Sequence, residues 1–127
     1  MLFKNSWSNF KLIMSTKLGL KIKIIEFADN SQPGFVNCTF TDSFGQEYKI
    51  FDKVPVVTDE YLDENSDYPK DGIVSCVILD ENPDKTNADI VQINIAEPLH
   101  ISTVNDETIF FVYKNQLTDY DKWTSKK

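Results

Sequence analysis

Residues 34–57, GFVNCTFTDSFGQEYKIFDKVPVV, decide the fold of this chain because they predict a β-hairpin. In the first half apolar and polar side chains alternate, which is typical of a strand with one buried face, here Val36, Cys38 and Phe40. A turn is expected at residues 42–45. Asp42 suits its first position because the carboxylate can accept backbone hydrogen bonds, and Gly45 supplies a positive φ at its end.

The return half predicts a second strand whose side chains face the same core at Tyr48, Ile50 and Val54. Pro55 then limits ladder pairing, because proline has no backbone N–H. Upstream, residues 17–29 predict another half-buried strand that runs to about Phe27. Its apolar positions alternate with lysines and are Leu18, Leu20, Ile22 and Ile24.

Downstream, further short strands are expected at residues 73–79, 88–96, 99–103 and 108–113. Thr58 has the character of an N-cap followed by acidic residues, which predicts a helical turn at 58–62, and one more turn is expected within 115–127. About seven short strands without a long helix predict an all-β fold, a single small antiparallel β-barrel or sandwich. The barrel is preferred because IVSCVIL and TIFFVY are apolar on both faces.

Residues 1–13 stand apart from this pattern. Met14 is a second candidate start, which makes 1–13 an extension and 14–127 a single β domain. Alternatively the extension forms a short amphipathic helix that packs on the domain or a partner, with apolar side chains at helical spacing at Phe3, Trp7 and Phe10. No stretch reaches the roughly 18 to 20 apolar residues that span a bilayer, and the N-terminus lacks the apolar run of a signal peptide.

Charge and cysteine content limit the classes of partner. The 127 residues include 20 acidic and 13 basic side chains, for a net charge of −7. Such a surface repels nucleic acids and anionic membranes, and fits either a basic protein partner or simple solubility. Cys38 and Cys76 lie among apolar neighbours, which favours two core thiols in a reducing, cytoplasmic compartment, although a disulfide between adjacent strands stays open.

The sequence contains no motif for catalysis, so we expect no enzyme, no cofactor and no metal site. His100 is the only histidine and is expected on the outward face of a strand, and the four glycines form no phosphate-binding loop. Asp63-x-Asn65-x-Asp67 and Asp80-x-Asn82-x-Asp84 begin as calcium loops do. Both lack the glycine at position six and the glutamate at position twelve, so they are interpreted as surface turns.

The acidic stretch 58–71 is the candidate partner-binding site. Clustered carboxylates steer a basic partner, and tyrosines supply aromatic anchors. The residues proposed for this contact are Asp59, Glu60, Tyr61, Asp63, Glu64, Asp67, Tyr68 and Asp71. The alternative interpretation is a solvated loop.

From Thr41 onward the chain resembles a group of small bacterial all-β proteins. The motifs in common are a D-x-x-G turn at 42–45, K-x-P-V-V at 53–57, Y-P-x-x-G at 68–72 and a strand with a central cysteine at Cys76. Proteins of this kind resemble toxin-neutralising immunity proteins of the contact-dependent inhibition type, which cover the basic active site of a toxin. The resemblance spans at most half of the chain and implies a fold; no functional residue is transferred from it.

The preferred hypothesis is therefore a non-catalytic, acidic protein-binding module, an immunity protein that occludes the basic surface of a toxin. One alternative is a β-barrel domain that binds a small ligand in its mouth, or an enzyme of unknown type, for which a deep apolar pocket is expected. Another is a structural subunit that assembles with copies of itself.

Overall fold

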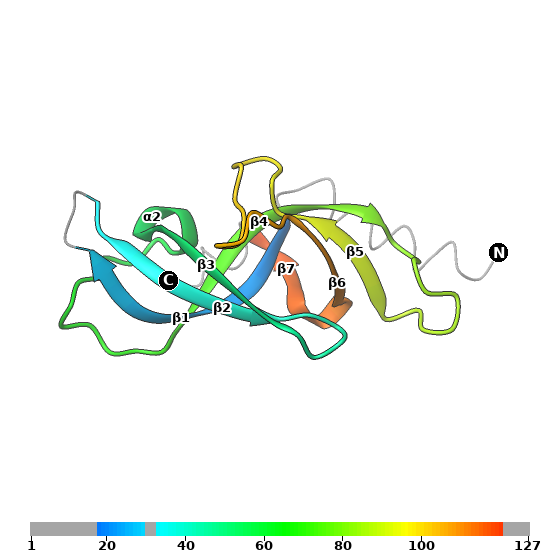
Figure 1. The fold of residues 1–127 in the computed structure, drawn as a ribbon, viewed down its shortest axis with the longest axis horizontal. Helices are drawn as coiled ribbons and strands as arrows, with labels where there is room; N and C mark the ends of the chain where they lie inside the picture. Colours follow the sequence, from blue (N-terminus) through cyan, green and yellow to red (C-terminus); the bar gives the residue numbers. More distant parts are fainter. Residues whose placement is uncertain (1–17, 30–32, 121–127) are drawn as a thin grey trace.

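The computed structural model describes residues 18–29 and 33–120, which form a curled, half-barrel sheet (Figure 1). The strands pair antiparallel in the order β3-β2-β1-β4-β5-β6, and β7 pairs with β1. The all-β prediction is confirmed. The elements are β1 (Leu18–Asp29), β2 (Phe35–Thr41), β3 (Glu47–Lys53), α2 (Val54–Val57), β4 (Lys70–Asp80), β5 (Ile90–Asn94), β6 (Ile109–Tyr113), η1 (Lys114–Gln116) and β7 (Leu117–Asp119).

The hairpin of β2 and β3 is confirmed in its register and its turn. Thr41 lies opposite Glu47, and the four-residue turn ends on Gly45 at a φ of 84°. The buried Asp42 carboxylate accepts hydrogen bonds from the N–H groups of Phe44 and Gln46, both at 2.9 Å. Asp42 therefore has the turn-forming role that its position predicted.

Strand β1 lies at the centre of the sheet, as its alternating pattern suggested. β4 pairs along one edge, while β7 and β2 pair with the two ends of the other edge. The predicted core side chains are buried, and Leu20 and Ile24 are completely enclosed. The sheet curls because aliphatic side chains from all of its long strands fill one interior.

The hairpin turn also contacts β6, at the far end of the strand order. Ser43 N–H donates to the Phe111 carbonyl at 2.8 Å, and the Tyr113 hydroxyl donates to the Ser43 carbonyl at 3.3 Å. The Gln116 side-chain amide donates to the Thr41 carbonyl at 2.8 Å. These bonds bring β6 back to the first hairpin and partly close the barrel.

The expected helical turn lies four residues earlier than predicted. α2 spans Val54–Val57 with Pro55 in its first turn, and Thr58 follows the helix in an extended conformation. Proline suits the first turn because its fixed φ is helical and its missing N–H has no partner there. The N-cap assignment of Thr58 was therefore wrong.

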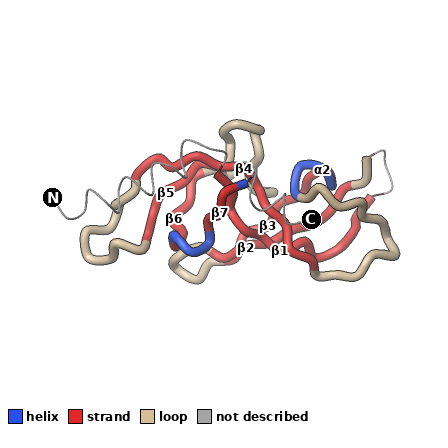
Figure 2. Tube along the Cα trace, turned by 180° about the vertical axis from the view of Figure 1, so that it is seen from behind, coloured by secondary structure: helices blue, strands red, loops and turns tan. Residues whose placement is uncertain are grey.

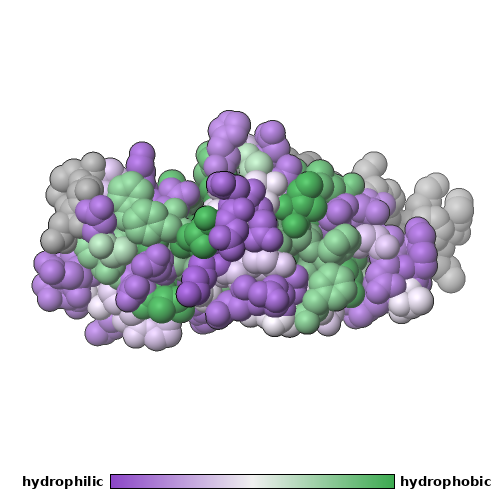
Figure 3. Space-filling view, in the orientation of Figure 1, coloured by the Kyte–Doolittle hydropathy of each residue, from purple (hydrophilic) through white to green (hydrophobic). Residues whose placement is uncertain are grey.

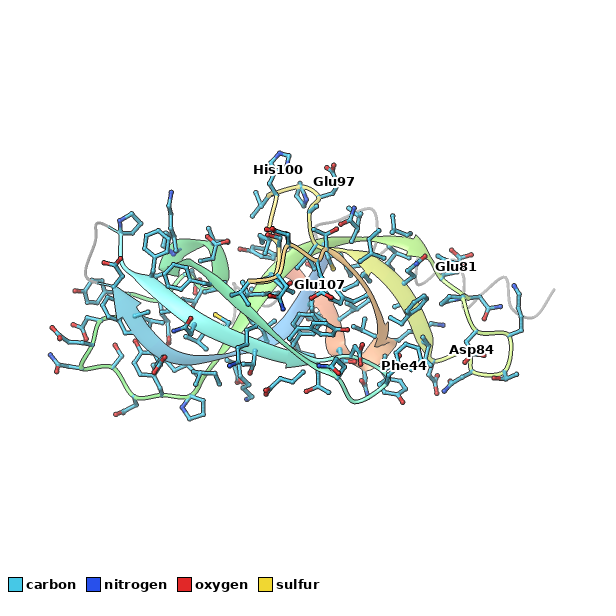
Figure 4. All side chains as sticks on the ribbon, viewed as in Figure 1. Phe44, Glu81, Asp84, Glu97, His100 and Glu107 are labelled. Carbon is cyan, nitrogen blue, oxygen red and sulfur yellow. The ribbon has the colours of Figure 1, made fainter. Side chains whose placement is uncertain are left out.

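The expected strand at residues 99–103 was also wrong, since these residues form a loop. His100 has a φ of 58°, which no strand accommodates, and its exposed side chain lies with that of Glu97 at the loop tip (Figure 4). Beyond it, Val104 N–H donates to the Lys49 carbonyl at 2.9 Å, so the loop covers part of the open edge of β3. The seventh strand is instead β7, directly after η1. The helical turn expected within 115–127 corresponds to η1, which begins one residue earlier, whereas β7 was not predicted.

Figure 2 shows from behind that strands dominate and that helical structure is limited to short turns. β4 is buried on both faces from Gly72 to Cys76, as its composition predicted, but Val77 and Leu79 are exposed, so the prediction was wrong for the end of the 73–79 stretch. β6 is buried on one face only, because Ile109 and Tyr113 are exposed. None of the helices within residues 18–29 and 33–120 has the length and apolar character needed to cross a bilayer. Residues 1–13 lie outside the described part of the chain.

Both cysteines are free and buried in the core. Cys38 pairs opposite Ile24 and Cys76 opposite Leu18, so about 20 Å of β1 separates them, too far for a disulfide. Burial raises the pKa of each thiol to about 12, and the charge of Asp52 adds to the shift at Cys38. These are inert core thiols, as the sequence favoured.

Candidate functional site

The acidic loop joins α2 to β4 and lies at the end of the molecule opposite the β5 strand (Figure 1). Its backbone is anchored where it leaves α2. Thr58 is buried, its N–H donates to the Val54 carbonyl, and its hydroxyl oxygen accepts the Glu60 N–H at 3.1 Å. Leu62 inserts its side chain into the core. The first half of the loop is thus fixed at both of its ends.

The second half of the loop is closed by Asp63. Its carboxylate accepts the Asn65 N–H at 2.9 Å, and its own N–H donates to the Ser66 hydroxyl at 3.0 Å. The Tyr68 hydroxyl donates to the Asp63 carbonyl at 2.7 Å, and the Tyr68 ring packs against the core. Burial raises the pKa of Tyr68 above its ordinary value, an effect that the Asp63 carboxylate reinforces and Ser66 opposes.

Between these anchors the loop presents one aromatic ring and three carboxylates to solvent. Tyr61 is 84% exposed although its neighbour Leu62 is buried. The carboxylates of Asp59, Glu64 and Asp67 are exposed around it along the chain. An exposed tyrosine on an ordered backbone loses little conformational entropy when a partner covers it.

The other two acidic residues of the prediction face lysines. The Glu60 carboxylate lies 3.7 Å from the Lys70 ammonium group, and Asp71 forms an ion pair with Lys23. Sequence reasoning missed Lys23 because it lies on β1, directly opposite Asp71 in the register of β1 and β4. Only strand pairing brings these two residues together.

The structure therefore divides the eight predicted site residues into three groups. Asp63 and Tyr68 hold the loop together, and Glu60 and Asp71 form ion pairs with lysines. The remaining residues face solvent from one loop, namely Asp59, Tyr61, Glu64 and Asp67.

The two calcium-like sequences are surface turns. Asp80 accepts the Asn82 N–H at 2.9 Å, and Asp84 accepts both the N–H and the hydroxyl of Thr86. Those two bonds lower the pKa of Asp84 below its ordinary value. Across residues 18–29 and 33–120, no three acidic, histidine or cysteine side chains are grouped as metal ligands.

Open grooves among the described residues include the following two. One, of about 380 Å³, lies at the β1 edge between β2 and β7, where Lys21, Thr39 and Gln116 contribute to its lining. The other, of about 480 Å³, separates β3 from the loop that contains Val104 and Glu107. Both have mixed polar and apolar linings, unlike the deep apolar pocket that small-ligand binding predicts.

Compared with known protein families, with curated proteins and with solved structures, the chain matches none of them.

Proposed function

We propose that this protein is a non-catalytic binding module that attaches to a basic protein surface through its acidic loop. The observation that supports it best is the geometry of that loop. An 84% exposed Tyr61 is presented beside exposed carboxylates on a backbone that Leu62 and Asp63 hold in place.

The physical basis has two parts. The net charge of −7 attracts a basic partner over distances near the Debye length, which raises the association rate. At contact, Tyr61 supplies an aromatic anchor on a backbone that is already ordered, so that less backbone entropy is lost on binding. The interior is filled by aliphatic side chains, which favours a surface interaction over a ligand held inside the barrel.

The more specific proposal is a toxin-neutralising immunity protein of the cytoplasm. Occlusion of a basic active site requires an acidic surface and no catalytic residues. The inert thiols and the exposed His100 on a loop tip are compatible with that role.

The test is affinity capture of the tagged protein from its own cells at low and high salt, followed by association kinetics with whatever is retained. The loop variant is Asp59→Asn/Glu64→Gln/Asp67→Asn, which leaves Asp63 in place because that residue closes the loop. We expect slower association by about tenfold and a weaker salt dependence, with an unchanged fold.

A control variant, Glu81→Gln/Asp89→Asn/Glu97→Gln, changes the net charge equally at other loops of the protein. It lowers long-range attraction but leaves the proposed contact intact, so association should slow less than with the loop variant. Equal effects of the two variants would contradict the loop as the binding site, and a retained partner that is acidic would contradict the proposal as a whole.

A further inference from the structure

The convex surface of β4, β5 and β6 has an apolar character that the acidic-loop proposal does not use. Val77, Asn94 and Ile109 lie side by side across the three strands. In the next row a bulge places Leu79 and Asp80 against Gln92, which faces Phe111 on β6. We call this surface the outer sheet face, defined by Val77, Leu79, Gln92, Asn94, Ile109, Phe111 and Tyr113.

The hairpin turn extends the outer sheet face by one more aromatic ring. The Phe44 ring meets the Phe111 ring edge-on, with centroids 5.9 Å apart and planes at 79°. Phe44 is 75% exposed and Ile109 is 50% exposed. Figure 3 shows hydrophobic surface over β5 and β6, and Figure 4 places Phe44 at the lower margin of this region.

The corresponding surface of β1, β2 and β3 is apolar where Phe51, which is 44% exposed, stacks on Phe35, and it carries lysines elsewhere. Lys23, Thr39 and Lys49 form one row across these strands, and Lys21 is exposed beside them. That is the usual composition of a solvated sheet face. The outer sheet face contains no charged side chain except Asp80 at its margin, whose carboxylate is bonded to the Asn82 N–H. Apolar and uncharged composition of this kind marks interfaces.

We propose that two copies of this chain associate through their outer sheet faces. This inference is independent of the acidic loop, which lies at the opposite end of the molecule (Figure 1). A basic partner would be expected to meet carboxylates, whereas two copies with a charge of −7 each must meet where neither has charge. The outer sheet face satisfies that condition.

The polar groups of the outer sheet face also suit contact between identical surfaces. Gln92 and Asn94 have side-chain amides; the Asn94 oxygen already accepts the Ala96 N–H at 2.9 Å, and its NH₂ group is a donor, while the Gln92 amide is both a donor and an acceptor. In a two-fold dimer each amide meets the same surface in the partner, so donors and acceptors are available on both sides. Carboxylates at these positions would repel one another.

The exposed area is sufficient for a weak dimer. An aromatic side chain has roughly 200 Å² of surface, so Phe44 alone offers about 150 Å². The whole face offers on the order of 500 Å² per copy, compared with about 800 Å² per partner in a standard interface. We therefore expect a dissociation constant of about 10 µM, with rim residues supplying the remaining area.

The test is sedimentation equilibrium of the full chain between about 1 and 100 µM, a range that brackets the expected dissociation constant. Measurements at about 50 and 500 mM NaCl vary the repulsion between copies. We expect dimerisation to become tighter at high salt, because screening weakens that repulsion. A protein that stays monomeric at the highest concentration and high salt would overturn the proposal.

Two lysine substitutions locate the interface. Ile109→Lys places a charge in the outer sheet face, while Ile25→Lys makes the same change on β1, where Ile25 is 41% exposed. Both change the net charge from −7 to −6, which weakens the repulsion between copies, so charge alone would strengthen dimerisation in each. We expect Ile109→Lys to weaken the dimer by about tenfold or more and Ile25→Lys to leave it within about twofold.

A second variant, Phe44→Ser, removes an exposed ring from a turn and guards against misfolding of the strand variant. It should weaken the dimer by about threefold to tenfold. Circular dichroism spectra must match the wild type for all three proteins. A dimer that forms equally well with Ile109→Lys and Phe44→Ser would show that copies meet elsewhere and would overturn the assignment.

Discussion

Replacement of Asp42 by alanine should destabilise the protein by about 2 kcal/mol. The buried carboxylate accepts two backbone N–H bonds at 2.9 Å, from Phe44 and Gln46, and one bond from the Tyr48 hydroxyl at 3.3 Å. Each N–H bond contributes about 1 kcal/mol, because the side chains of both donors are exposed and water can replace the carboxylate in part. The longer Tyr48 bond contributes about 0.5 to 1 kcal/mol, and relief of the carboxylate's desolvation offsets some of the sum.

Urea unfolding, monitored by circular dichroism, measures this change in the free energy of unfolding. A loss of about 2 kcal/mol lowers the midpoint by about 1 to 2 M at an ordinary slope for a domain of this size. Asp42→Asn keeps a neutral acceptor for both N–H groups and should lose about half as much. Asp89→Ala, an exposed carboxylate in another loop, is the matched control and should lose less than about 0.5 kcal/mol.

The reasoning would be refuted by an Asp42→Ala midpoint equal to that of Asp89→Ala. Equal losses of stability in Asp42→Ala and Asp42→Asn would contradict one step of the reasoning, because they would mean that an acceptor at this position contributes nothing. A change in slope would instead indicate that the hairpin unfolds separately.

Two further predictions concern the core. The pKa of the Cys38 and Cys76 thiols is raised to about 12 from an ordinary 9.0, so above pH 9 the unfolded chain binds fewer protons than the native one and stability must fall with rising pH. The thiol contribution to the free energy of unfolding is complete below pH 9 and should shrink by about 1.4 kcal/mol per thiol by pH 10. Urea unfolding at pH 8 and pH 10 should therefore show a smaller loss of stability between the two pH values for Cys38→Ala than for the wild type. Identical losses would contradict the thiol origin. Gly72→Ala should lose about 1 to 3 kcal/mol in thermal unfolding, because its Cβ would lie 2.9 Å from Ile24 Cδ1 and 3.1 Å from the Val57 carbonyl oxygen. An unchanged melting temperature would mean that the backbone of β4 yields easily at this point.

The local sequence contained enough information for the central strands. The alternation of Leu20 and Ile24 with lysines identifies the buried face of β1, since a strand has a period of two. Asp42 and Gly45 determine the hairpin turn because both act on backbone groups only a few residues away. These two predictions, which depend on near neighbours in the chain, were therefore confirmed.

Similar local reasoning failed at two other places in the chain. Thr58 has the composition of a helix start, but Pro55 favours a helix that begins earlier, and Thr58 follows its end. Residues 99–103 alternate as a strand does, yet a positive φ at His100 bends the backbone and Val104 bonds to the edge of β3. A stronger local signal prevailed at Thr58, and a tertiary contact overrode a weak local preference at 99–103.

Composition and charge pointed to the acidic loop from the sequence alone, whereas its division of roles depended on the fold. Tyr61 and Tyr68 look equivalent in the sequence, but only Tyr68 reaches the core and the Asp63 carbonyl. Lys23 meets Asp71, and Phe44 meets Phe111, through strand pairing and hairpin closure that link residues far apart in the chain. Alternation along the chain identified most of the strands, because it is a local property, but it missed β7 and wrongly included 99–103. Which side chains remain exposed together depends on which strands become neighbours, and only the fold determines that.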